Sequence, residues 1–85
     1  MPYIRQDVRT ALDEGGVPRD SGELAYVLSQ VVDEYLSHRI VNYAKHAEVV
    51  GVLETLKLEY YRRFTGPYED QKREENGEAF FYARD

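Results

Sequence analysis

The stretch VVGVLETLKLEYYRRFTGPYEDQKREENG, residues 49–77, holds the longest helical pattern of the chain. Its apolar residues recur every three or four positions, as expected for one face of an α-helix, at Val49, Leu53, Leu56, Tyr60 and Phe64. Pro67 interrupts this pattern, because proline disfavours the α conformation of the residue before it and lacks the N–H donor of a helix interior. We therefore expect a long helix that ends at Thr65 or Gly66.

A short fourth helix is predicted after this break. Pro67 suits the first turn of a helix, where its missing N–H costs nothing. Glu69 and Asp70 follow in that turn, where the helix dipole favours acids, and Gly77 is a typical C-terminal stop. The remaining residues 78–85, EAFFYARD, are aromatic and too short for a strand pair. We expect them to form an arm that docks on the protein's own core or on a neighbour.

Two further helices are predicted upstream. The first carries an amphipathic pattern that stops at Gly15-Gly16 and is formed by Ile4, Val8, Ala11 and Leu12. Asp20 is the expected N-cap of the second helix, with Glu23 completing a capping box. This helix should end near Ser37–Arg39, and its inward stripe is expected to be Leu24, Val27, Leu28, Val31 and Tyr35. Asn42 then serves as the N-cap of the long helix.

Size and composition favour one small all-α domain over residues 1–85, a bundle of three main helices plus a short C-terminal helix. A chain of 85 residues without cysteine has a marginal core and no disulfide to support it. We therefore expect a homo-oligomer. The eight tyrosines agree with this expectation, because tyrosine fills interfaces well.

The charge and hydropathy of the chain exclude some partners. A net charge of −5 argues against general nucleic-acid or anionic-membrane binding, which needs clustered positive charge. No apolar run approaches the roughly 20 residues of a membrane span, so we expect a soluble, cytoplasmic protein.

Several segments together resemble a known family. They are MPYI at the start of the chain, GELAYVLSQVVDEYL (22–36), VVGVLETLKLEYYRR (49–63) and PYEDQKREENG (67–77). The chain resembles a family of small uncharacterised proteins, a domain of unknown function, found in phages and in bacteria with phage-like elements. The resemblance implies small size, helices and a phage setting, which would place the protein in the host cell cytoplasm, and it implies no site residue.

The sequence does not indicate an enzyme, a cofactor or a metal site. His38 and His46 are eight residues apart, without cysteine or a zinc-binding spacing. Phosphate-binding glycine motifs are missing. The acidic pairs at 69–70 and 74–75 can in principle hold a divalent cation, but the solvated face of a helix is the favoured interpretation.

Lys57 is a stronger candidate for a functional residue than the histidines or the acidic pairs. A helix of about 100° per residue places it inside the apolar arc, between Leu53 and Tyr61. In the structural interpretation its stem covers apolar surface while its ammonium reaches Glu54. In the functional interpretation Glu54, Lys57 and Tyr61 line a cavity at a helix or subunit interface.

A possible ligand surface lies near the predicted bend. Arginine forks bind phosphate or carboxylate, and tyrosine adds a stacking face and a hydroxyl. The candidate ligand-binding residues are Lys57, Tyr61, Arg62, Arg63 and Tyr68, with Glu54, Glu69 and Asp70 as secondary candidates.

Three hypotheses of function follow. The leading one is a non-enzymatic phage-type protein that sequesters a small anionic molecule or a nucleotide signal. The alternative is an adaptor whose tyrosine-rich face and aromatic tail grip a host or phage protein. The third is a small metal-dependent hydrolase that uses Glu54 with Glu69 and Asp70.

Overall fold

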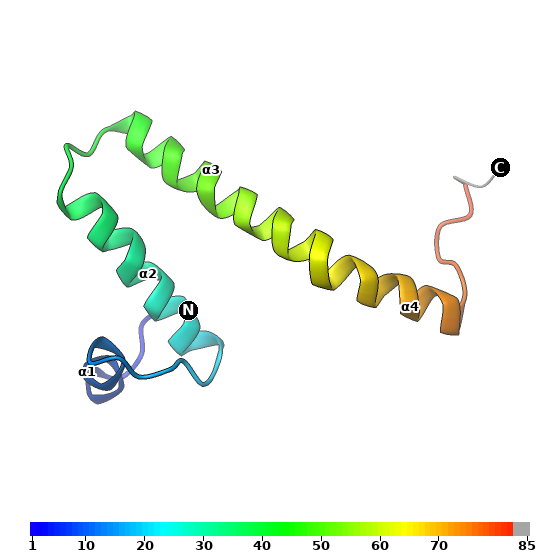
Figure 1. The fold of residues 1–85 in the computed structure, drawn as a ribbon, viewed down its shortest axis with the longest axis horizontal. Helices are drawn as coiled ribbons and strands as arrows, with labels where there is room; N and C mark the ends of the chain where they lie inside the picture. The colour runs from blue at the N-terminus through cyan, green and yellow to red at the C-terminus, as the bar shows by residue number, and fades with distance from the viewer. Residues whose placement is uncertain (83–85) are drawn as a thin grey trace. The chain divides into compact units, whose positions relative to one another are not determined.

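Helices form all the regular structure in the computed structural model, which describes residues 1–82 (Figure 1). They are α1 (Gln6–Asp13), α2 (Ser21–Ser37), α3 (Tyr43–Tyr60), the π-helical turn η1 (Tyr61–Thr65) and α4 (Gly66–Asn76). The described residues contain no strand, so the all-α prediction is confirmed. The chain divides into two units, Met1–His46 and Ala47–Asp85. The expectation of one domain and of an oligomer stays a prediction.

In the first unit, α1 packs against α2 through a small core. Tyr26 is only 6% exposed and Leu12 only 8%. The Tyr26 hydroxyl donates to both carboxylate oxygens of Asp13, at 2.8 and 3.1 Å. The guanidinium of Arg9 lies 5.3 Å from the centre of the Tyr26 ring. A buried tyrosine with a satisfied hydroxyl therefore joins the two helices.

The cap of α2 is confirmed in part. The Asp20 carboxylate accepts the backbone N–H of Glu23 at 2.9 Å, as expected. The capping box also predicts that the Glu23 carboxylate accepts the backbone N–H of Asp20, and this bond is replaced by another. The Glu23 carboxylate accepts instead from the backbone N–H of Arg19 and from its guanidinium, both at 3.1 Å. Glu23 is buried, and the arginine supplies donors for both of its oxygens.

The predicted inward stripe of α2 was wrong in its position. Leu24 and Val31 are 51% and 63% exposed, whereas Tyr26 is buried. The reason is that α1 covers the flank of α2 that carries Tyr26, through the bond to Asp13. Much of the apolar face of α2 therefore remains exposed.

The long helix begins as expected but does not end at the predicted break. Asn42 caps it, with its side-chain oxygen accepting the N–H of Lys45 at 3.0 Å. At the other end α3 continues through η1 into α4 (Figure 1). The predicted end at Thr65 or Gly66 is wrong, and the short fourth helix is the last part of one longer helix.

A widened turn lets the helix pass the proline. The N–H of Gly66 donates to the carbonyl of Tyr61, five residues earlier, which is the π-helical pattern. In an α-helix the ring of Pro67 would clash with the carbonyl of Arg63, four residues earlier. The wider turn moves that carbonyl away. Glycine suits position 66, because a Cβ there would lie 3.2 Å from the Tyr61 carbonyl oxygen.

The π turn also changes which residues share a face. In an α-helix, residues seven positions apart lie on the same side. The π turn contains one extra residue, so across it the residues that share a side are eight positions apart. The Tyr61 hydroxyl does donate to the carboxylate of Glu69, eight residues later. By the same shift Tyr68 follows Tyr60. One continuous face, here called the apolar stripe, thus carries Val49, Leu53, Leu56, Tyr60, Phe64 and Tyr68.

The C-terminal end of α4 is the predicted one. Gly77 has a φ of +97°, a backbone conformation that residues with a Cβ rarely adopt. Its N–H donates to the carbonyl of Arg73 at 2.8 Å.

Replacing Pro67 with alanine should convert the π turn into an ordinary α turn. Alanine supplies the missing N–H and removes the ring, so the helix should become about 1–3 kcal/mol more stable. The altered register should separate Tyr61 from Glu69. The pKa of Tyr61, which the hydrogen bond to Glu69 raises, should then fall to the ordinary value of about 10 in an NMR titration. A variant with lower helix content and an unchanged Tyr61 pKa would contradict this explanation of the turn.

Candidate functional site

The apolar stripe is the largest feature of the second unit. Leu53 is 45% exposed, Leu56 55% and Tyr60 61%, and Phe64 and Tyr68 are exposed to a similar degree. Val49 is half-buried. The rings of Tyr60 and Phe64 lie 5.0 Å apart at the middle of the stripe and support each other. A contiguous exposed apolar surface of this kind is typical of a site that binds another molecule.

The predicted cationic residues are mostly neutralised by neighbouring acids. Lys57 lies 3.2 Å from Glu54, as the structural interpretation of that lysine predicted. Arg62 lies 2.7 Å from Glu59, three residues before it. Both pairs are exposed, so each contributes little to stability.

Arg63 differs from the other predicted cations. Its guanidinium lies 5.7 Å from the centre of the Phe64 ring, and among residues 1–82 it has no acidic partner. A helical rotation of about 100° per residue separates it from Arg62. The structure therefore does not bring the two arginines together as one anion-binding fork.

The remaining predicted residues also have partners along the helix. The Tyr61 hydroxyl is bonded to Glu69, and the Lys72 ammonium lies 5.8 Å from the centre of the Tyr68 ring. Asp70 lies 3.5 Å from Arg73.

The three residues of the hydrolase hypothesis do not converge. Glu54 is separated from Glu69 and Asp70 by fifteen or sixteen residues of helix, which at 1.5 Å per residue is about 23 Å. Within residues 1–82 no three His, Cys, Asp or Glu side chains gather closely enough to hold a metal ion.

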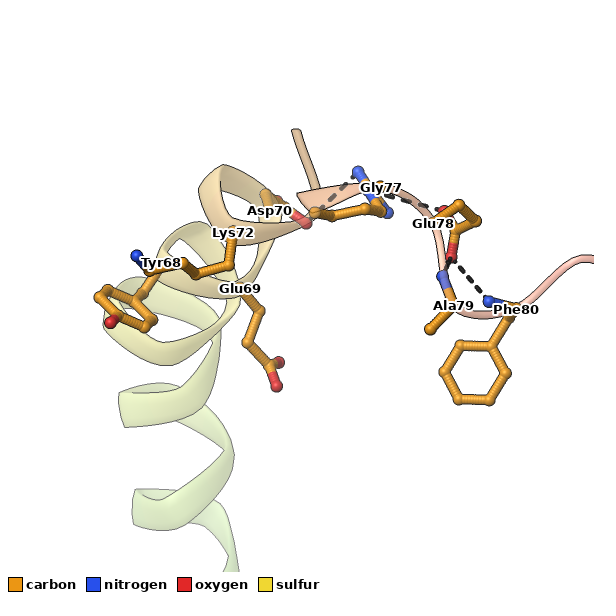
Figure 2. A pocket seen from close by; sticks show the side chains of 9 residues that line it. Tyr68, Glu69, Asp70, Lys72, Gly77, Glu78, Ala79 and Phe80 are labelled. Atoms are coloured by element: carbon orange, nitrogen blue, oxygen red, sulfur yellow. Dashed lines mark hydrogen bonds and ion pairs between the residues drawn. The ribbon is translucent and has the colours of Figure 1, made fainter. Parts of the chain in front are cut away.

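A hollow of about 430 Å³ lies between the end of α4 and the segment that follows it (Figure 2). Tyr68 and Phe80 contribute its aromatic lining, and Lys72 and Arg73 contribute cationic groups. These charges are already paired within the chain, since Lys72 lies 3.4 Å from Glu75 and Arg73 contacts Asp70. Neither cationic group of the hollow is therefore free to attract an anion.

Glu78, which was not among the residues predicted to matter, organises this segment. Its carboxylate accepts the backbone N–H groups of Ala79 and Phe80, both at 3.0 Å, and lies 3.7 Å from the guanidinium of Arg73 (Figure 2). The bond from Phe80 is the largest cause that lowers the pKa of Glu78. The signal for this turn was an acid directly after the glycine stop. Of the predicted docking arm, residues 83–85 lie outside the described part of the chain.

Comparison with known proteins identifies a family. A model described as a domain of unknown function (DUF6899) matches residues 1–79, and the chain belongs to this family. The comparisons with curated proteins and with solved structures gave no match. The resemblance to a family of unknown function is confirmed at this level, and the phage setting stays a prediction. No helix within residues 1–82 combines the length and the apolar character of a membrane span.

Acid should release the segment that follows α4. Because the pKa of Glu78 is lowered in the folded state, its carboxylate stabilises the turn above the ordinary glutamate pKa of about 4.3 and loses that effect as the pH falls through the lowered pKa. The amide chemical shifts of Ala79 and Phe80 should change together, with a midpoint below about 4.3. The variant Glu78→Gln should lack this transition. A midpoint at or above the ordinary value would contradict the role given to Glu78.

Proposed function

We propose that this member of the DUF6899 family is a non-enzymatic interaction adaptor that binds a helix of a partner protein along the apolar stripe. The observation that supports the proposal is the exposure of that stripe, from Leu53 to Tyr68, on one face of α3, η1 and α4. The adaptor hypothesis thereby gains more from the structure than the hypothesis of a sequestered anion.

The area of the stripe is large enough to matter for binding. A buried aromatic side chain covers about 150–250 Å², so three that are somewhat more than half exposed offer roughly 100 Å² each. With the aliphatic residues the stripe offers about 500 Å², comparable to the largest patch on a typical monomer. At about 25 cal/mol per Å² its burial would supply on the order of 12 kcal/mol. Association costs about 4–15 kcal/mol, so a partner must cover most of the stripe to bind tightly.

The shape of the stripe favours a helical partner. It is elongated, because Tyr68 follows Val49 by nineteen residues, which at 1.5 Å per residue is about 28 Å. Its side chains are spaced by three or four residues, which is the spacing that interlocks with the ridges of a second helix. A small ligand would cover only a fraction of this length.

The charges around the stripe give less support to an anionic ligand. An anion would have to displace Glu54 from Lys57 and Glu59 from Arg62. The net charge of −5 would also repel it at long range. A protein partner needs neither displacement, because its helix would cover apolar atoms and leave these exposed ion pairs at the rim.

A photo-crosslinking amino acid tests the proposal in the cells that make the protein. It would replace Leu56, which lies on the stripe, or in a control Leu58, which has nearly the same exposure, 55% against 57%. Two helical residues correspond to about 200°, so the control position lies on the other side of the helix. Position 56 should give a defined covalent adduct that mass spectrometry identifies as a protein, and position 58 should not. Equal adducts at both positions, or none at position 56, would contradict the adaptor function.

A further inference from the structure

The part of the apolar stripe from Leu56 to Tyr68 has the same spacing of apolar residues when it is read in either direction. The Tyr60 and Phe64 pair forms its centre, beside the π turn. Four residues before Tyr60 lies Leu56, and four residues after Phe64 lies Tyr68. A second helix of the same sequence, running in the opposite direction, would therefore place an apolar side chain opposite each of these four. A two-fold axis between Tyr60 and Phe64 generates that arrangement.

The charges on one flank of the stripe agree with such a pair. Lys57 and Tyr61 lie on the same flank, one turn apart. The hydrogen bond from Tyr61 fixes Glu69 on this flank as well. In an antiparallel pair each flank faces the same flank of the second copy, so Lys57 comes opposite Glu69 of the other chain, and the reciprocal pair forms on the other side of the axis.

The other flank is complementary in the same way. It carries Glu59 and Arg63, one turn apart, and Arg63 has no acidic partner among the described residues. The two-fold axis brings Arg63 close to Glu59 of the second copy. A parallel pair would set Lys57 near Glu59 of the other chain but would leave Arg63 without an acid, so the charges favour the antiparallel pair.

The buried area approaches that of a stable dimer. The four central residues offer about 400 Å² in each copy, so the pair buries about 800 Å² of apolar surface there, and Leu53 with the flanking side chains raises the total toward the range of about 1,200–2,000 Å² that is typical of specific interfaces. Pattern, charge and area thus point to the same occupant.

We infer that the helix bound by the apolar stripe is the same helix of a second copy of this chain, in an antiparallel pair centred beside the π turn. This inference rests on the proposed function, since it names the partner of the same surface. The π turn is required for the pairing, because it aligns Tyr68 with the rest of the stripe and Glu69 with the flank of Lys57.

Disulfide trapping tests the pairing, and the chain is a suitable background because it contains no cysteine. One preparation carries Leu56→Cys and a second, with a mass tag, carries Tyr68→Cys. Both positions are exposed in the chain, so folding should persist, and circular dichroism would check it. On mild oxidation the mixture should yield the mixed disulfide dimer at least about tenfold above the homodimer of either preparation, because position 56 faces position 68 of the second copy.

A control mixture pairs Leu58→Cys with the same Tyr68→Cys protein and should give no more than background. Strong self-crosslinking of the Leu56→Cys protein would show a parallel pair and overturn the inference. Absence of any mixed dimer would overturn it as well. If the photo-crosslinker at position 56 then captures a different protein, the adaptor function stands and self-pairing falls; if it captures nothing, both fall.

Discussion

A helix gains much of its stability when another surface covers its apolar face, and such an apolar face is the main feature of the second unit of this protein. The helical backbone from Tyr43 to Asn76 satisfies its own hydrogen bonds, but in proteins most helix stability comes from packing of an apolar face rather than from propensity. The apolar stripe is such a face, and its side chains from Leu53 to Tyr68 are exposed. The adaptor function and the antiparallel pair are both ways of covering this face.

The π turn keeps the apolar residues before and after it on one face of the helix. A proline in a helix interior usually kinks or breaks it, at a cost of about 3 kcal/mol. Here the carbonyl of Tyr61 bonds to Gly66 instead, and the added residue rotates everything that follows. Without that rotation Tyr68 would drift off the face of Tyr60, and Glu69 would lie out of reach of the Tyr61 hydroxyl. π turns are frequent at functional sites, and this one lies at the centre of the proposed interface.

Local signals in the sequence predicted the helix ends well. Asp20, Asn42 and Gly77 act at the predicted positions because a cap depends only on the next few residues. The π turn was missed, since a glycine and a proline in succession indicate a break equally well, and only the packed backbone shows which outcome costs less. The buried face of α2 was misplaced because it depends on where α1 docks. Ion pairs at spacings of three residues were predictable, as at Glu54 and Lys57, whereas the eight-residue contact from Tyr61 to Glu69 has no counterpart in a regular helix.

Hydrogen exchange at different protein concentrations tests the central claim most directly. If the apolar stripe is covered by another molecule of the same chain, amide protection from Val49 to Tyr68 should rise steeply between nanomolar and high micromolar concentration, because association is concentration-dependent. Protection in α1 and in the first half of α2 should change much less, since the bond from Tyr26 to Asp13 lies within one chain. Equal protection of the long helix at all concentrations would contradict the claim that its stability depends on a second molecule.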